Sequence, residues 1–190
     1  MKYAAEVATE RYHLSQRILH WVVAVLVISG LAAGMTLGTL GFEGAREALG
    51  ATATNALYTA HKTVGVLVLV LMVVRLALRL ARGRPDYYRP LRRWRRFMSR
   101  TVHGLLYILL IAMPVVGWLA TAAGGFPVEF FAWHLPGLVG EDDALSAQLF
   151  FWHAALGWSI LALVLLHVAG ALQHWWVLRD GVMQRMSLLP

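Results

Sequence analysis

The chain alternates between long apolar stretches without charge and short segments rich in charge. Residues 18–42, 101–128 and 144–178 contain no Asp, Glu, Lys or Arg, and residues 48–74 contain only Lys62. A helix needs about 20 apolar residues to cross a hydrocarbon core about 30 Å thick. The pattern therefore predicts four membrane-spanning helices, which we place at residues 18–40, 56–79, 101–123 and 147–177.

Composition supports a membrane protein. Hydrophobic residues make up 59% of the 190 positions and charged residues 14%, whereas soluble domains average about 45–50% apolar and about 25% charged residues. We therefore predict an all-α membrane protein, a bundle of four transmembrane helices. The whole chain, residues 1–190, is expected to form one integral-membrane domain.

Basic and acidic residues occupy different connections between the apolar stretches. Lysine and arginine accumulate in cytoplasmic loops, so the distribution predicts a multi-pass protein of the bacterial inner membrane with both termini in the cytoplasm. The net charge of +7 would also suit nucleic-acid binding. The basic residues flank membrane spans, however, so we expect them to contact anionic lipid headgroups and predict no nucleic-acid partner. The second connection and its flanks carry Arg75, Arg79, Arg82, Arg84, Arg89, Arg92, Arg93, Arg95, Arg96 and Arg100; the terminal segments carry Lys2, Arg11, Arg17, Arg179 and Arg185; the other two connections carry Glu43, Glu47, Glu129, Glu141, Asp142 and Asp143.

Two histidines lie fourteen residues apart in the last charge-free stretch, His153 and His167. Fourteen steps of about 100° return to within roughly 40° of the same helix face, and the rise is about 21 Å. One helix would thus present two imidazoles, one near each side of the bilayer. Because ionisable groups are costly inside a membrane, these histidines are functional candidates.

Histidines of the first two spans supply partners at matching depths. With both termini inside, His20 would lie at the depth of His167 on the cytoplasmic side, and His61 at the depth of His153 on the periplasmic side. The chain has no cysteine, which excludes thiolate-bound iron–sulfur clusters and haem attached through Cys-x-x-Cys-His. We therefore predict two noncovalently held haems whose irons are ligated by these two histidine pairs.

A porphyrin that lies against a helix needs a small residue one turn beyond its ligand. Each proposed ligand meets this condition, whereas His103 is followed at that spacing by Tyr107 and His174 by Leu178. Exchange of one ligand with His103 or His174 is the alternative. Iron with two imidazoles has no open position for oxygen, which suits electron transfer. The small residues four positions after the ligands are Ala24, Gly65, Gly157 and Ala171.

Several short segments together resemble the bacterial di-haem cytochrome b561 family, which is related to the cytochrome b subunits of Ni-hydrogenase and formate dehydrogenase. The resemblance implies a four-helix bundle with two b-type haems, the ligand pairs above, and electron exchange with the membrane quinone pool. It covers nearly the whole chain. The segments are residues 17–21, 60–65, 73–76, 103–117, 152–153, 166–167 and 173–175.

One activity of that family is superoxide oxidation, in which superoxide on the periplasmic side gives up its electron and ubiquinone is reduced. For this chain the resemblance implies oxidation of superoxide to O₂. Lys62 directly follows His61 and is placed to attract an anionic donor. The alternative is that Lys62 extends to lipid headgroups. Residues 127–136 are expected to form a cap over the periplasmic haem.

Reduction of a quinone needs protons as well as electrons, so we expect polar groups at the cytoplasmic mouth. His174 lies seven residues after His167, within about 20° of the same helix face and about 10 Å closer to the cytoplasm. A histidine changes charge near neutral pH and can bind a quinone carbonyl or relay a proton. Arg17 and Arg75 are expected at the same mouth, where pairing with haem propionates or headgroups is favoured over contact with quinone.

Two other functions fit the same residues. The chain could be a transmembrane electron-transfer cytochrome b without catalysis of its own, serving a separate dehydrogenase or a periplasmic partner protein. It could also be a histidine-lined metal carrier without haem. A b-type absorption spectrum separates the last possibility from the others.

Overall fold

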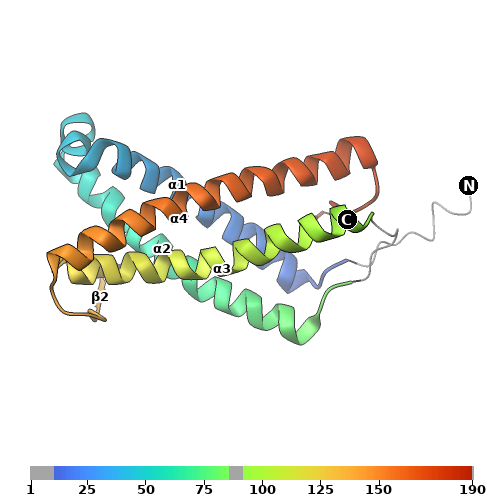
Figure 1. Cartoon of the computed structure of the whole chain (residues 1–190), viewed down its shortest axis with the longest axis horizontal. Helices are drawn as coiled ribbons and strands as arrows, with labels where there is room; N and C mark the ends of the chain where they lie inside the picture. The colour runs from blue at the N-terminus through green and yellow to red at the C-terminus, as the bar shows by residue number, and fades with distance from the viewer. Residues whose placement is uncertain (1–10, 86–91, 190) are drawn as a thin grey trace, which may run out of the picture.

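Four long helices dominate the computed structural model, which describes residues 11–85 and 92–189. The first three predicted spans each lie inside one helix, and the fourth lies in the last helix together with its continuation; all four are long and apolar enough to cross a membrane. The predicted all-α bundle of four spans is thus confirmed (Figure 1). Of the basic residues considered above, Lys2 and Arg89 lie outside the described residues. The helices are α1 (Leu14–Leu49), α2 (Ala51–Arg82), α3 (Arg93–Ala123) and α4 (Asp143–Leu172), and α4 continues as the π-helix η2 (Gln173–Leu178).

Glycine and a capping aspartate set several helix boundaries. Gly50 and Gly83 follow α1 and α2 with φ of 83° and 65°, a conformation that residues with a Cβ rarely adopt. Gly41, with φ of 67°, interrupts the helical backbone inside α1, directly after the predicted span 18–40. Asp142 caps α4 by accepting a hydrogen bond from the backbone N–H of Leu145 at 2.9 Å, which satisfies a donor that a helix start leaves free.

The helices pack as two pairs, α1 with α2 and α3 with α4, and α2 also contacts α3. The shared core is apolar and includes Val23, Val27, Met72, Leu110 and Ile160. In the most apolar 18-residue stretch of each helix, no more than 22% of the residues are buried inside the protein. The remaining apolar side chains face outward, as expected for helices whose solvent is lipid.

The two ends of the bundle differ in structure (Figure 1) and in the charge of their residues. At the hairpin end, α1 joins α2, and α3 joins α4 through two short antiparallel strands, β1 (Val128–Phe130) and β2 (Trp133–Leu135). At the arginine-rich end lie the starts of α1 and α3 and the ends of α2 and η2. Sequence reasoning expected a cap between residues 127 and 136 but no strands.

Candidate functional site

His61 of α2 and His153 of α4 face each other in the half of the bundle nearer the hairpin end. Their ring centroids are 6.0 Å apart and the ring planes are inclined by 86°. The other predicted pair also comes together: the rings of His20 on α1 and His167 on α4 are 6.1 Å apart, inclined by 72°. Helix α4 therefore contributes one imidazole to each pair, and the fourteen-residue spacing separates them by about 21 Å along the helix.

These separations suit two imidazoles on opposite sides of one metal ion. Two metal–nitrogen bonds of about 2.0 Å, together with roughly 1 Å from each nitrogen to its ring centre, give about 6 Å between centroids. His103 lies nearer to His167, with ring centroids 4.9 Å apart, which leaves too little space for an ion between the two rings. The distances therefore favour His20 over His103 as the partner of His167.

Each pair offers only two protein ligands. Among residues 11–85 and 92–189, no group of three or more His, Asp or Glu side chains is placed to hold a metal ion. Iron in a porphyrin takes four nitrogens from the macrocycle and needs just two axial ligands from the protein. The donor set of each pair therefore fits haem.

His61 and His153 both line a cavity whose other lining residues are apolar. Gly65 borders this cavity, and a Cβ added to it would meet nothing within 4 Å. Gly157 is in contact with the neighbouring helix instead, since an added Cβ would lie 3.4 Å from the Cε atom of Met113. Space beside the ligand is therefore evident at Gly65, while Gly157 brings α4 close to α3.

Two other glycines touch the imidazoles directly. A Cβ added to Gly34 would lie 2.8 Å from Cε1 of His61, and one added to Gly117 would lie 2.7 Å from Cε1 of His153. No side chain fits at either position without moving the ring. Sequence reasoning missed this role, although the spacing of Gly30 and Gly34 is a known signal for close helix packing.

In the pair of His61 and His153, the surroundings of the Nδ1 atoms leave Nε2 available to bind a metal ion. Nδ1 of His153 lies 3.2 Å from the carbonyl oxygen of Met113, the arrangement in which a ligating histidine donates Nδ1–H and binds metal through Nε2. Nδ1 of His61 is buried without a hydrogen-bond partner. The backbone of α3 thus orients His153, while the ring of His61 packs against Gly34 of α1.

Arg75 orients His20 in the other pair. Its Nη2 donates to Nδ1 of His20 at 2.8 Å, and its Nε donates to the hydroxyl of Tyr107 at 3.2 Å. Arginine has no acceptor, so Nδ1 of His20 must be unprotonated in this arrangement. If His20 bound a metal ion through Nε2, its remaining ring proton would be on Nδ1. The guanidinium of Arg75 would then need another acceptor, such as a haem propionate.

Arg17 lies against the C-terminal segment. Its Nη1 donates to the carbonyl oxygen of Ser187 at 2.7 Å, and Trp21 donates to Met186 at 2.9 Å. The side chain of Arg17 therefore ties the start of α1 to residues near the end of the chain. Its predicted contact with a cofactor stays a prediction.

His174 lies in η2, and its ring is oriented by a carboxylate that sequence reasoning missed. Nδ1 of His174 is 2.6 Å from Oδ2 of Asp180, and the two side chains are 15% and 11% exposed. The sequence did hold a signal, because Asp180 is the first acidic residue after the charge-free stretch that ends at residue 178.

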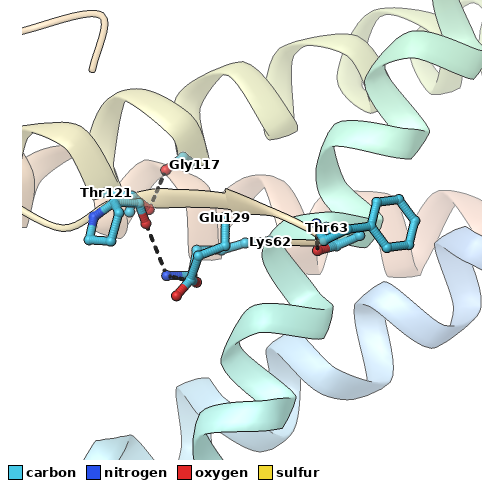
Figure 2. A network of polar contacts seen from close by, with 7 residues as sticks. Lys62, Thr63, Gly117, Thr121 and Glu129 are labelled. Carbon is cyan, nitrogen blue, oxygen red and sulfur yellow. Dashed lines mark hydrogen bonds and ion pairs between the residues drawn. The ribbon is translucent and has the colours of Figure 1, made fainter. Parts of the chain in front are cut away.

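Lys62 is joined to the hairpin (Figure 2). Its Nζ donates to the carbonyl oxygen of Pro127 at 3.1 Å and lies 2.5 Å from Oε2 of Glu129. The neighbouring Thr63 accepts a hydrogen bond from the backbone N–H of Phe131 at 3.1 Å. Lys62 therefore neither stands free as a cation nor extends to headgroups; together with Thr63 it fastens the cap to α2.

Comparisons with known proteins agree with this architecture. A sequence model of the prokaryotic cytochrome b561 family matches residues 11–187. The chain is 28% identical over 181 residues to cytochrome b561 homolog 2 of Escherichia coli, which covers 93% of this chain and 91% of that protein. It is 28% identical to cytochrome b562 of Cereibacter sphaeroides, over 92% of this chain and 94% of that protein. It is 25% identical to the probable superoxide oxidase CybB of Yersinia pestis, over 93% and 96%.

Proposed function

The chain belongs to the prokaryotic cytochrome b561 family of haem-binding, electron-transferring membrane proteins, and we propose that it is a di-haem quinone oxidoreductase that oxidises superoxide. Its place as a multi-pass protein of the bacterial inner membrane follows from the family and the four spanning helices. The two pairs of facing histidines are the observation that carries the di-haem assignment.

We assign one haem b to His61 and His153 and a second to His20 and His167. The support is the separation of about 6 Å within each pair, the apolar cavity beside Gly65, and the glycines that let the imidazoles lie against α1 and α3. Gly157 lets α4 approach α3 next to the first pair. When bound, haem with two imidazole ligands supplies one-electron transfer without an open coordination position.

We place the arginine-rich end in the cytoplasm and the hairpin end in the periplasm. This orientation follows the rule that basic residues remain on the cytoplasmic side. The hairpin end is then where superoxide approaches, and His61 with Lys62 is the part of the chain that meets it. The protein of Yersinia pestis named a probable superoxide oxidase matches this chain over most of its length, which favours the same donor.

At the cytoplasmic end we propose that ubiquinone accepts the electrons. Two superoxide anions give two electrons and two molecules of O₂, and one quinone takes up two electrons and two protons to become a quinol. His174 supplies or relays a proton, and Arg75 and Arg17 provide the positive charge for haem propionates. In this assignment His174 and Lys62 are the groups that meet the two substrates.

Absorption spectroscopy and rapid mixing test the proposal. The purified protein should show a sharp b-type α band in its reduced-minus-oxidised spectrum and about two haems per chain. Superoxide mixed with the oxidised protein should reduce haem quickly, and ubiquinone should then reoxidise it. A colourless preparation made with ample haem would contradict the haem assignment, and absent reduction by superoxide would contradict the choice of donor.

A second function is favoured by one observation. Because Glu129 neutralises Lys62 at 2.5 Å, the attraction of an anionic donor is weakened, which suits a transmembrane electron carrier serving another protein. The same mixing experiment distinguishes the two functions. Two haems that are reduced slowly by superoxide but rapidly by quinol would favour the carrier.

A further inference from the structure

Asp180 stands apart from the other acidic residues of the described chain. Six of the seven lie at the hairpin end: two in the last turns of α1, one in β1 and three at or just before the start of α4. Asp180 is the one described acidic residue at the arginine-rich end. Its position next to η2 therefore calls for an explanation other than general surface charge. The other six are Glu43, Glu47, Glu129, Glu141, Asp142 and Asp143.

The backbone turns Asp180 back toward His174. Arg179 has a left-handed conformation, with φ of 46° and ψ of 44°, and directly follows η2. Oδ2 of Asp180 then lies 2.6 Å from Nδ1 of His174, while Oδ1 accepts a hydrogen bond from the backbone N–H of Val182 at 3.3 Å. Both carboxylate oxygens are thus engaged, and the side chain is fixed relative to the ring.

The partner of this carboxylate is informative. The arginine-rich end offers many guanidinium groups, yet Asp180 is bonded to an imidazole, and both side chains are largely buried. A buried carboxylate is costly unless it is paired, and a charge-assisted hydrogen bond is short and strong. The arrangement fixes the proton of neutral His174 on Nδ1 and leaves Nε2 as the nitrogen that can exchange a proton with a substrate.

We propose that Asp180 is a positioning residue for proton transfer by His174 during quinone reduction, an inference that rests on the proposed function. The imidazolium of His174 gives its Nε2 proton to a quinone oxygen as the quinone takes up electrons. Nδ1 keeps its proton and its hydrogen bond to Asp180, which stays ionised. Water at the same end returns the lost proton to Nε2, and a second cycle completes the two protons of the quinol.

The decisive experiment compares steady-state reduction of a short-chain ubiquinone by superoxide in haem-loaded variants. Asp180→Asn should lower kcat roughly 10- to 100-fold, by analogy with the loss of a carboxylate that orients a metal-ligating histidine, with KM within about twofold. Asp180→Glu should recover part of kcat. Asp143→Asn, which removes a carboxylate at the other end of α4, should match the wild type.

A double mutant tests whether Asp180 acts through His174. The variant His174→Gln combined with Asp180→Asn should be no slower than His174→Gln alone, because residues that act as one unit are not additive. Losses that multiply would overturn the inference. Single-turnover reduction of haem by superoxide without quinone should be unchanged in every variant, which separates the quinone step from the folding and loading of the protein.

A measurement independent of turnover examines the ring itself. In protein labelled with ¹⁵N-histidine, the His174 signals, identified by their loss in His174→Gln, should report the Nδ1–H tautomer. Asp180→Asn should shift them toward a mixture. A wild-type ring that is protonated on Nε2 but not on Nδ1, or unchanged kcat in Asp180→Asn, would overturn the inference while leaving the proposed function intact. A wild type that reduces no quinone would overturn the proposed function, and this inference with it.

Discussion

The imidazole of His153 lies so close to the backbone of Gly117 that a Cβ at residue 117 would stand 2.7 Å from the ring. The same relationship holds for His61 and Gly34 on the opposite side, at 2.8 Å. Real Cβ atoms do not approach a ring so closely, so any side chain must displace the imidazole. Two helices that contribute no ligand to this pair therefore determine where its ligands lie.

The first prediction is that Gly117→Ala releases the haem assigned to His61 and His153. The added methyl group should push the imidazole of His153 away, because the ring lies directly against the backbone of Gly117 and leaves no space for a Cβ. We expect about one haem per chain instead of two, measured as haem content against protein concentration. Gly38→Ala is the matched control: an added Cβ there meets nothing within 4 Å, and alanine is the better helix former by about 1 kcal/mol. Full occupancy in Gly117→Ala would show that the ring tolerates displacement.

Sequence reasoning predicted the spans from the length of the apolar stretches, and it paired the histidines by their expected depth in the membrane. The long apolar stretches correspond to α1 to α4, and the helical angle places His153 and His167 on one stripe. It could not predict that Gly34 and Gly117 lie against imidazoles of other helices, nor that a turn brings Asp180 to His174. A glycine has no side chain whose chemistry would indicate what it contacts. Asp180 reaches His174 only through the left-handed turn at Arg179.

The cap shows the same limit. The aromatic segment before α4 suggested a cover near His61, yet its fastening depends on pairing across elements. Lys62 reaches Glu129 and Pro127, and Thr63 binds Phe131. No local pattern relates these residues, which lie more than 60 positions apart. From the sequence, Lys62 was therefore expected either to attract an anionic donor or to extend to lipid headgroups, and Glu129 was one of the acidic residues of a connection.

The second prediction separates the ligand from its neighbour at the arginine-rich end. His167→Ala should lose the haem of that end, because it removes one of two axial nitrogens. His103→Ala should keep both haems, because a ring centroid 4.9 Å from that of His167 is too close to share an ion with it. Haem content and the reduced-minus-oxidised spectrum measure both outcomes. Loss of one haem in His103→Ala, with normal loading in His20→Ala, would exchange the two assignments.

The third prediction concerns Arg75, which donates to His20 at 2.8 Å. Arg75→Gln removes a positive charge beside one haem and so stabilises its oxidised form. Its midpoint potential should fall by on the order of tens of millivolts, given a unit charge within a few ångströms of a partly buried site. Potentiometric titration should show this shift in one haem only.

Arg82→Gln provides the control for Arg75. Arg82 lies at the end of the same helix and binds Ser15, so its loss should leave both potentials within experimental error. Equal shifts in the two variants would mean that the general charge of the arginine-rich end, rather than the position of Arg75 beside His20, sets the potential.

The fourth prediction concerns the ion pair at the hairpin end. Glu129→Gln leaves Lys62 without its counter-ion, so a cation next to His61 becomes available to an anionic donor. Reduction of haem by superoxide should become several-fold faster at low salt, and the rate should depend more steeply on ionic strength, because steering by unpaired charge is screened by salt. Stopped-flow mixing at two or more salt concentrations measures both effects.

Two further variants make that fourth test specific. Lys62→Gln combined with Glu129→Gln should return the rate and its salt dependence to those of the wild type, since the pair carries no net charge. Glu43→Gln removes an exposed carboxylate of the same end that pairs with Arg46 at 3.8 Å, and it should have little effect. If Glu43→Gln accelerates the reaction as much as Glu129→Gln does, total surface charge governs the approach of superoxide and the contact between Lys62 and Glu129 does not.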